Sequence, residues 1–173
     1  MSADLWKLVE WYKENANKSK TKLAINSNLG GKQDLIDKLC DIAPYMPSLD
    51  VYTSCEATGE SCNYIRDGMD FNIWWDNIRK VRDAGINTHC MMTVNALCLQ
   101  TLPDLIDKIL TERMESQNKE FAVFSLNILR FPSFQSCLVL PQHIRNICAF
   151  RLEQLQKKWA PKYLNRSHAM HQF

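Results

Sequence analysis

The sequence contains little glycine and proline, with five and six residues respectively among 173. This scarcity excludes collagen-like repeats and argues against long low-complexity or disordered segments, which are rich in such residues. Hydrophobic residues make up 46% and charged residues 23% of the chain, as is ordinary for globular proteins. A chain of this length can bury enough apolar surface to form one folded domain.

Long apolar runs and a strong charge of one sign are also lacking. No apolar stretch reaches the roughly eighteen residues that a membrane span needs, and the first residues do not resemble a secretion signal. We therefore expect a cytoplasmic protein with no membrane partner. The formal net charge of +2 does not favour nucleic acid, and a small basic group at Lys157, Lys158, Lys162 and Arg166 supports only a weaker hypothesis of RNA or DNA binding.

Cysteine is present, but the sequence lacks the short spacings that mark metal sites. The chain contains no CxxC pair, and its closest cysteines, Cys55 and Cys62, are seven positions apart. The other cysteines are Cys40, Cys90, Cys98, Cys137 and Cys148. An odd number of cysteines without a signal peptide indicates reduced thiols, and we expect no metal site.

Apolar residues follow helical spacing in some segments and form short buried runs in others, and the two kinds of segment alternate. Helices are expected at 5–15, 35–43, 71–84, 102–110 and 141–159, and strands at 22–27, 49–54, 87–94 and 121–127. The alternation predicts an α/β fold of about four parallel βα units, either part of a (β/α) barrel or an open doubly wound sheet. We expect this domain to span residues 1–160 and a loose tail to span 161–173.

Three segments, in this order, resemble consecutive strands of radical S-adenosylmethionine (SAM) proteins, particularly those with a SPASM or twitch extension. Residues 23–31 are similar to the third strand and its "TNGG"-type turn, with Ser27 where threonine is common. Residues 49–56, followed by Tyr-Ile-Arg-Asp-Gly at 64–68, resemble the fourth strand and the segment after it. Residues 92–97 resemble the fifth strand, and the resemblance covers roughly residues 5–130.

The resemblance implies an enzyme that reductively cleaves SAM on a [4Fe–4S] cluster and uses the resulting 5′-deoxyadenosyl radical to abstract hydrogen from a substrate. The family holds that cluster with a CxxxCxxC loop, and this sequence contains neither that spacing nor the family's glycine-rich motif at the second strand. We therefore expect a fragment that begins before the third strand, from a truncated reading frame, a split gene or a shortened chain, and that is inactive alone.

An alternative function is a non-catalytic binding or scaffold module that keeps the barrel segment without the cluster. In either case a partial barrel leaves strand edges and apolar surface uncovered. We expect a separate chain that supplies the missing N-terminal strands, or self-association, to cover them.

The resemblance also implies which residues bind the cofactor. Ser54 and Glu56 match the positions that reach the SAM ribose or nearby polar atoms, although the family more often has aspartate in place of Glu56. Arg66 matches an arginine that can pair with the carboxylate of the methionine moiety. In a purely structural alternative, Arg66 pairs with Asp67 or Asp70 within a turn.

Two further candidates follow the strand at 87–94. Thr93 and Asn95 could meet SAM or the substrate, because functional groups of parallel α/β folds gather at the carboxyl ends of strands. The favoured structural alternative is that Asn95 caps the turn before the next helix. The segment Asn28-Leu29-Gly30-Gly31 lacks the residues of a phosphate-binding loop and is interpreted as a tight turn.

Overall fold

Four parallel strands form a single sheet in the computed structural model, which describes residues 3–15, 22–46, 48–118 and 120–169. The strands lie in the order β1 (Leu23–Asn26), β2 (Leu49–Ser54), β3 (Asn87–Val94) and β4 (Val123–Ile128). Each strand therefore pairs with the next one along the chain. The predicted α/β fold with four parallel strands alternating with helices is confirmed.

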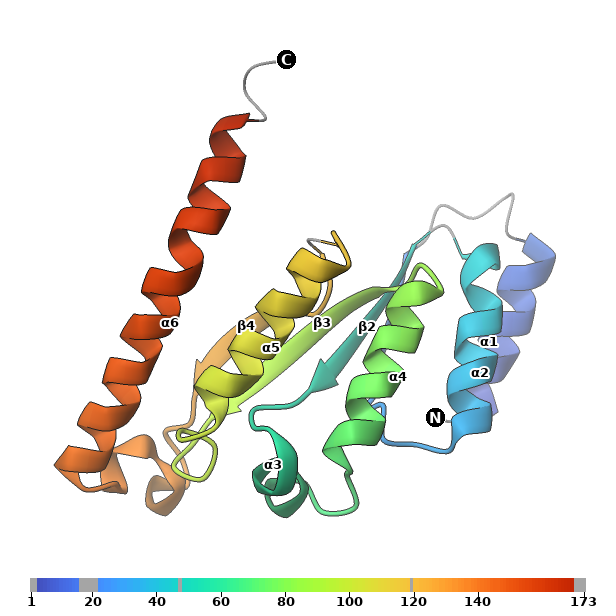
Figure 1. Ribbon diagram of the computed structural model, residues 1–173. Coiled ribbons are helices and arrows are strands. Elements are labelled where there is room, and N and C mark those ends of the chain that lie inside the picture. Colours follow the sequence, from blue (N-terminus) through green and yellow to red (C-terminus); the bar gives the residue numbers. More distant parts are fainter. Residues whose placement is uncertain (1–2, 16–21, 47, 119, 170–173) are drawn as a thin grey trace.

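Six α-helices accompany the sheet within the described residues. They are α1 (Ala3–Asn15), α2 (Gln33–Ile42), α3 (Gly59–Ile65), α4 (Phe71–Asp83), α5 (Leu102–Glu115) and α6 (Gln142–Ala169). Figure 1 shows α2, α4 and α5 on the same side of the sheet, with α1 beside α2 and α6 beside α5. The strand order does not reverse, and the crossover helices lie on one side of the sheet. Both features are those of a partial (β/α) barrel rather than of a doubly wound sheet.

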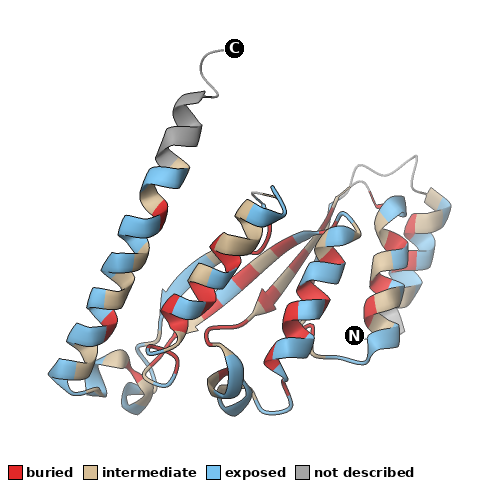
Figure 2. Cartoon of the chain, in the orientation of Figure 1, coloured by how far each residue is buried: buried red, intermediate tan, exposed pale blue. Residues whose placement is uncertain are grey.

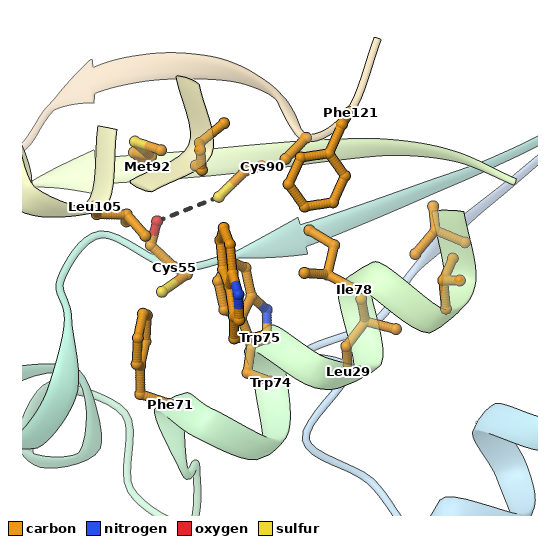
Figure 3. Close-up of a cluster of buried hydrophobic side chains, with 14 of the residues drawn as sticks. Leu29, Cys55, Phe71, Trp74, Trp75, Ile78, Cys90, Met92, Leu105 and Phe121 are labelled. Carbon is orange, nitrogen blue, oxygen red and sulfur yellow. Dashed lines mark hydrogen bonds between the residues drawn. The ribbon is translucent and has the colours of Figure 1, made fainter. Parts of the chain in front are cut away.

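The hydrophobic core lies between the sheet and these helices. Val51 of β2 is fully buried, as are Cys90 and Met92 of β3 and Trp74 and Ile78 of α4. Figure 3 draws Cys90, Met92, Trp74 and Ile78 in one cluster between β3 and α4, and Figure 2 shows in red the buried residues along the strands and helices. Burial of each larger aliphatic or aromatic side chain stabilises the fold by about 1.5–3 kcal/mol. The core therefore fixes which face of each strand meets the helices.

A buried polar contact supplements this packing. The indole Nε1 of Trp74 donates a hydrogen bond of 2.9 Å to the hydroxyl of Thr53. Both residues are buried, so the bond satisfies two polar groups that water does not reach. It fixes the first turns of α4 to the carboxyl end of β2.

Several bounds differ from the sequence prediction: α5, expected at 102–110, extends to Glu115, and β4 and α6 differ as well. β4 begins at Val123 rather than at residue 121, because Arg113 donates hydrogen bonds of 2.6 and 2.8 Å to the carbonyls of Phe121 and Ala122. Helix α6 continues past Pro161 to Ala169, so the expected loose tail is helical up to that residue. Residues 170–173 of that tail lie outside the described residues, and the domain boundary at 160 stays a prediction.

No helix in the described part of the chain is long and apolar enough to cross a membrane.

Candidate functional site

The carboxyl ends of β2 and β3 lie side by side, as the parallel register requires. Ser54, the last residue of β2, pairs with Met91 of β3, and Thr93 lies two residues further along β3. Because alternate residues of a strand point to opposite faces, Ser54 and Thr93 share the face that is turned away from the core helices. Neither hydroxyl makes a side-chain hydrogen bond within the described residues, so both are available to a ligand.

Glu56 and Arg66 form an ion pair directly after β2. Arg66 donates from Nε and Nη2 to Oε2 of Glu56, at 2.9 and 2.7 Å. The Glu56 side chain is only 5% exposed, whereas that of Arg66 is 27% exposed. The pair therefore combines a buried carboxylate with a guanidinium that solvent reaches, and Nη1 takes no part in it.

Helix α3 holds Arg66 in this position, and the sequence did not predict this helix. The backbone N–H of Arg66 bonds to the carbonyl of Cys62 at 3.0 Å, which places Arg66 at the C-terminal end of α3. The structural alternative for Arg66 is wrong, since its ion-pair partner is Glu56 and not Asp67 or Asp70. Asp70 instead caps α4 by accepting hydrogen bonds from the N–H groups of its first turn.

Asn95 shapes the loop that follows β3. Its Oδ1 accepts hydrogen bonds from the backbone N–H groups of Leu97 at 2.9 Å and Cys98 at 3.1 Å. Its Nδ2 donates to the carbonyl of Thr93 at 3.1 Å. Asn95 therefore caps this turn, as the structural alternative predicted, and its side-chain oxygen Oδ1 already accepts two backbone hydrogen bonds.

The turn after β1 has the tight geometry that the sequence predicted. Ser27 Oγ accepts from the N–H of Leu29, and Asn28 Oδ1 accepts from the N–H of Gly30, both at 3.2 Å. Leu29 adopts a φ of 51°, which non-glycine residues seldom do. Asn77 of α4 holds it there by donating to its carbonyl at 2.7 Å.

The sequence did not reveal a second polar group on the open face of the sheet. The rings of Tyr52 and His89 stack with centroids 4.4 Å apart. Asp50 lies on β2 two residues before Tyr52, farther from the carboxyl end of that strand. Asn87 Nδ2 donates to Asp50 Oδ1 at 2.8 Å, and His89 Nε2 lies 3.6 Å from the same oxygen. The alternation of apolar Leu49, polar Asp50 and apolar Val51 is the sequence signal that could have identified this face.

The residues present do not fit an iron–sulfur cluster. No group of three or more histidine, cysteine or acidic residues in the described ranges could hold a metal ion. Burial raises the pKa of Cys90 to about 12 and that of Cys98 to about 11, so both remain protonated thiols at neutral pH. Clusters are held by several cysteines that converge on one point, and the cysteines in the described part of the chain form no such group.

Comparison with solved structures identifies one informative relative. The sequence matches no protein-family profile and no curated protein. The structure of native anSMEcpe with bound AdoMet superimposes with a TM-score of 0.54 at 14% sequence identity. The chain therefore has part of its fold in common with this structure. At this identity the likeness concerns the fold alone.

The match covers nearly all of this chain but less than half of the relative. It includes 94% of the 173 residues and 43% of the anSMEcpe chain. The four βα units thus correspond to a portion of a larger structure. In parallel folds of this kind, ligands bind at the carboxyl ends of the strands, where Ser54, Glu56, Arg66 and Thr93 lie in this chain.

Proposed function

We propose that this chain binds S-adenosylmethionine (AdoMet) at the carboxyl ends of β2 and β3, as the later part of a radical SAM-type barrel. The observation that carries the proposal is the ion pair between Glu56 and Arg66, which stands directly after β2 in a fold shared with an AdoMet-bound protein. The Arg66 guanidinium is partly exposed and its Nη1 takes no part in the pair with Glu56. It can therefore donate hydrogen bonds to the carboxylate of a ligand beside that buried partner.

Each candidate residue has a role in this proposal. Arg66 pairs with the carboxylate of the methionine moiety, while Ser54 and Glu56 make hydrogen bonds to ribose hydroxyls. Thr93 contributes a further hydroxyl from the neighbouring strand. Asn95 contributes mainly by shaping the loop, because its oxygen is already bonded to the backbone.

The proposal assigns binding to these residues and not the cleavage of AdoMet. When bound, AdoMet supplies a 5′-deoxyadenosyl group, and its reductive cleavage in this superfamily depends on a [4Fe–4S] cluster. The sequence has no CxxxCxxC spacing, so the cluster would need ligands from other residues. A non-catalytic module that holds AdoMet without cleaving it is the second candidate, and the same missing cysteine motif favours it.

Genomic DNA immediately upstream of the reading frame distinguishes these two candidates. An in-frame or neighbouring CxxxCxxC sequence supports the radical enzyme. Its absence, together with the absence of a partner gene, would leave the non-catalytic module.

Equilibrium dialysis with radiolabelled AdoMet tests the binding site itself. We expect Arg66→Ala to weaken AdoMet binding by about tenfold or more, because a hydrogen bond to a charged group contributes about 1.5–3 kcal/mol. Arg66→Lys keeps the positive charge but loses the planar fork, so it should retain part of the affinity. Arg79→Ala, which removes an exposed arginine of α4, is the matched control and should bind like the unaltered chain.

A second ligand identifies the group that Arg66 recognises. 5′-Methylthioadenosine keeps the adenosine but lacks the methionine carboxylate, so Arg66→Ala should not change its affinity. An equal loss for both ligands would show that Arg66 acts through the fold. Absence of AdoMet binding by the unaltered, folded chain would reject the proposed function.

A further inference from the structure

Four buried cysteines gather at the carboxyl ends of β2 and β3. Cys55 follows β2, Cys62 lies in α3, Cys90 lies in β3 and Cys98 lies in the turn after β3. Cys90 donates a hydrogen bond to the carbonyl of Cys55 at 3.4 Å, visible as the dashed line in Figure 3. Cys98 is engaged with the backbone of Asn95. These two thiols therefore have backbone partners.

Cys55 and Cys62 differ because their sulfur atoms also contact each other, beside the hydrogen bond of 3.3 Å that Cys55 donates to the carbonyl of Ala57. Their sulfur atoms lie 3.6 Å apart, and this is the only sulfur–sulfur hydrogen bond among the described residues. A disulfide needs a separation of about 2.05 Å, so a shift of less than about 2 Å brings the sulfurs to bonding distance. Side-chain rotation within the loop that joins β2 to α3 can provide such a shift.

From this geometry we propose that Cys55 and Cys62 are a redox site, which a peroxide converts to a disulfide that clamps α3 to the end of β2. The proposal is independent of AdoMet binding. It concerns residues that the sequence analysis interpreted only as reduced thiols.

The environment of the two thiols makes their roles unequal. The hydrogen bond from Cys55 lowers the pKa of Cys62, and nearby Arg66 acts in the same direction, whereas burial and the Glu56 and Asp70 carboxylates oppose it. Burial and the bond to Cys62 raise the pKa of Cys55. Cys62 is therefore the thiol that ionises first, and Cys55 is the resolving thiol.

The oxidation balances with peroxide as the only co-reactant. The Cys62 thiolate attacks one oxygen of hydrogen peroxide and breaks the O–O bond, which leaves a sulfenic acid and releases hydroxide. The Cys55 sulfur then attacks the Cys62 sulfur, and the sulfenic oxygen leaves as water. Two thiols lose two electrons and two protons in total, and the peroxide becomes two waters. The thiols are 0% and 1% exposed, which favours an oxidant of this small size.

The position of the bond gives it a consequence for the neighbouring residues. Cys55 directly precedes Glu56, and Cys62 lies one helical turn before Arg66, whose N–H bonds to its carbonyl. The ion pair already joins the two ends of this short segment. A disulfide would add a covalent link beside it, so residues 56–66 would open less often when oxidised.

Mass spectrometry after peroxide treatment tests the bond. Alkylation of the unfolded chain should label seven thiols before treatment and five afterwards, because two of the seven are joined. Cleavage after Glu56 separates Cys55 from Cys62, so a disulfide should hold the two peptides together until a dithiol reductant is added. Persistent alkylation of both cysteines, or a disulfide that joins either one to Cys90, would overturn the proposal.

Two variants separate the roles of the thiols. In Cys55→Ser, the Cys62 sulfenic acid has no resolving thiol, so a dimedone label should accumulate on Cys62. Cys137→Ser is the control, since Cys137 is more exposed, and it should form the disulfide like the unaltered chain. If peroxide modified Cys40 and Cys137 before Cys62, exposure alone would govern oxidation and the assignment would be wrong.

Hydrogen exchange tests the clamp without relying on any variant that has to fold. Oxidation of the unaltered chain should slow amide exchange in residues 56–66 relative to the reduced chain, with little change in α6. A disulfide that leaves this exchange unaltered would contradict the proposed clamp.

Discussion

Asp107 of α5 forms a polar connection to α6, beside the ion pair between Asp104 and Arg151. Its carboxylate accepts hydrogen bonds from Lys158 at 2.7 Å and from the indole Nε1 of Trp159 at 2.6 Å. Burial alone raises the pKa of Asp107, but the bonds from Lys158 and Trp159 outweigh burial and lower it. The ionised carboxylate is therefore the form that the folded chain prefers.

This preference predicts a pH-dependent contribution to stability. Because the pKa is lower in the folded than in the unfolded chain, the contribution is present above the unfolded value of about 4 and disappears as the pH falls through the folded value. We expect Asp107→Ala to lower the urea midpoint at pH 6 and to make a smaller difference near pH 3. A difference that stays constant over this range would show that the charge of Asp107 is unimportant, and Asp67→Ala is the exposed control.

Helix α4 illustrates how one element positions several others. Asp70 caps its first turn by accepting from the N–H groups of Asn72 at 2.8 Å and Ile73 at 3.0 Å. Gly85, with a φ of 83°, follows its last turn in the left-handed conformation typical of a helix stop. Trp74 and Asn77 then bond from this helix to β2 and to the turn after β1. The start of α4 therefore affects both strands.

Removing the cap should destabilise the chain measurably. Asp70→Ala leaves two N–H groups of the first turn without their side-chain acceptor, and we expect a loss of about 1 kcal/mol in the free energy of unfolding. Urea denaturation followed by circular dichroism measures this loss. Asp76→Ala removes an exposed carboxylate from the middle of the same helix and should change stability by less. Equal effects of the two substitutions would contradict the capping role.

Both edges of the sheet, at β1 and at β4, lack a strand partner among the described residues. β4 pairs with β3 along one edge, and no strand within the described ranges pairs with its other edge. A mainly apolar cavity of about 650 Å³ lies between β4, α5 and α6, lined in part by Leu126, Ile128 and Leu138. The Ile128 side chain is 71% exposed. We propose that self-association or a second chain covers this region, since open strand edges and apolar surface favour both.

A charge placed in this region should reduce self-association. We expect sedimentation velocity to show concentration-dependent association of the unaltered chain, and Ile128→Lys to shift it toward the monomer. Ile73→Lys, at an exposed isoleucine on α4, is the matched control and should leave association unchanged. A monomer at all concentrations would argue instead for a different partner or for none.

Much of the fold could be predicted from local patterns. The strand at 87–94 was predicted with its observed bounds, because an apolar run between a glycine stop and a polar turn has few alternatives. Helix α3 was missed because its seven residues carry no clear apolar period. Helix α6 was predicted too short because Pro161 ordinarily ends a helix, whereas here the helix continues through it.

The candidate site was predictable only in part. The candidate residues lie at or just after the ends of two strands that the sequence placed correctly, and parallel pairing brings those strand ends together. They are Ser54, Glu56, Arg66, Thr93 and Asn95. The partner of Arg66 was not predictable, because a side chain that is ten residues from Glu56 meets it only after α3 forms. Whether these residues bind AdoMet remains a prediction.

The sequence by itself determined the alternation of helices and strands, the tight turn after β1 and the lack of a cluster motif, since these depend on residues close together in the chain. The tertiary structure decided which face of each strand stays open, which places Tyr52 against His89 on that face. It also decided that the sulfur of Cys55 contacts the sulfur of Cys62, whereas Cys90 bonds to the backbone carbonyl of Cys55. Such contacts depend on the packing of α3 and on the register of the strands, neither of which is encoded in any single local segment.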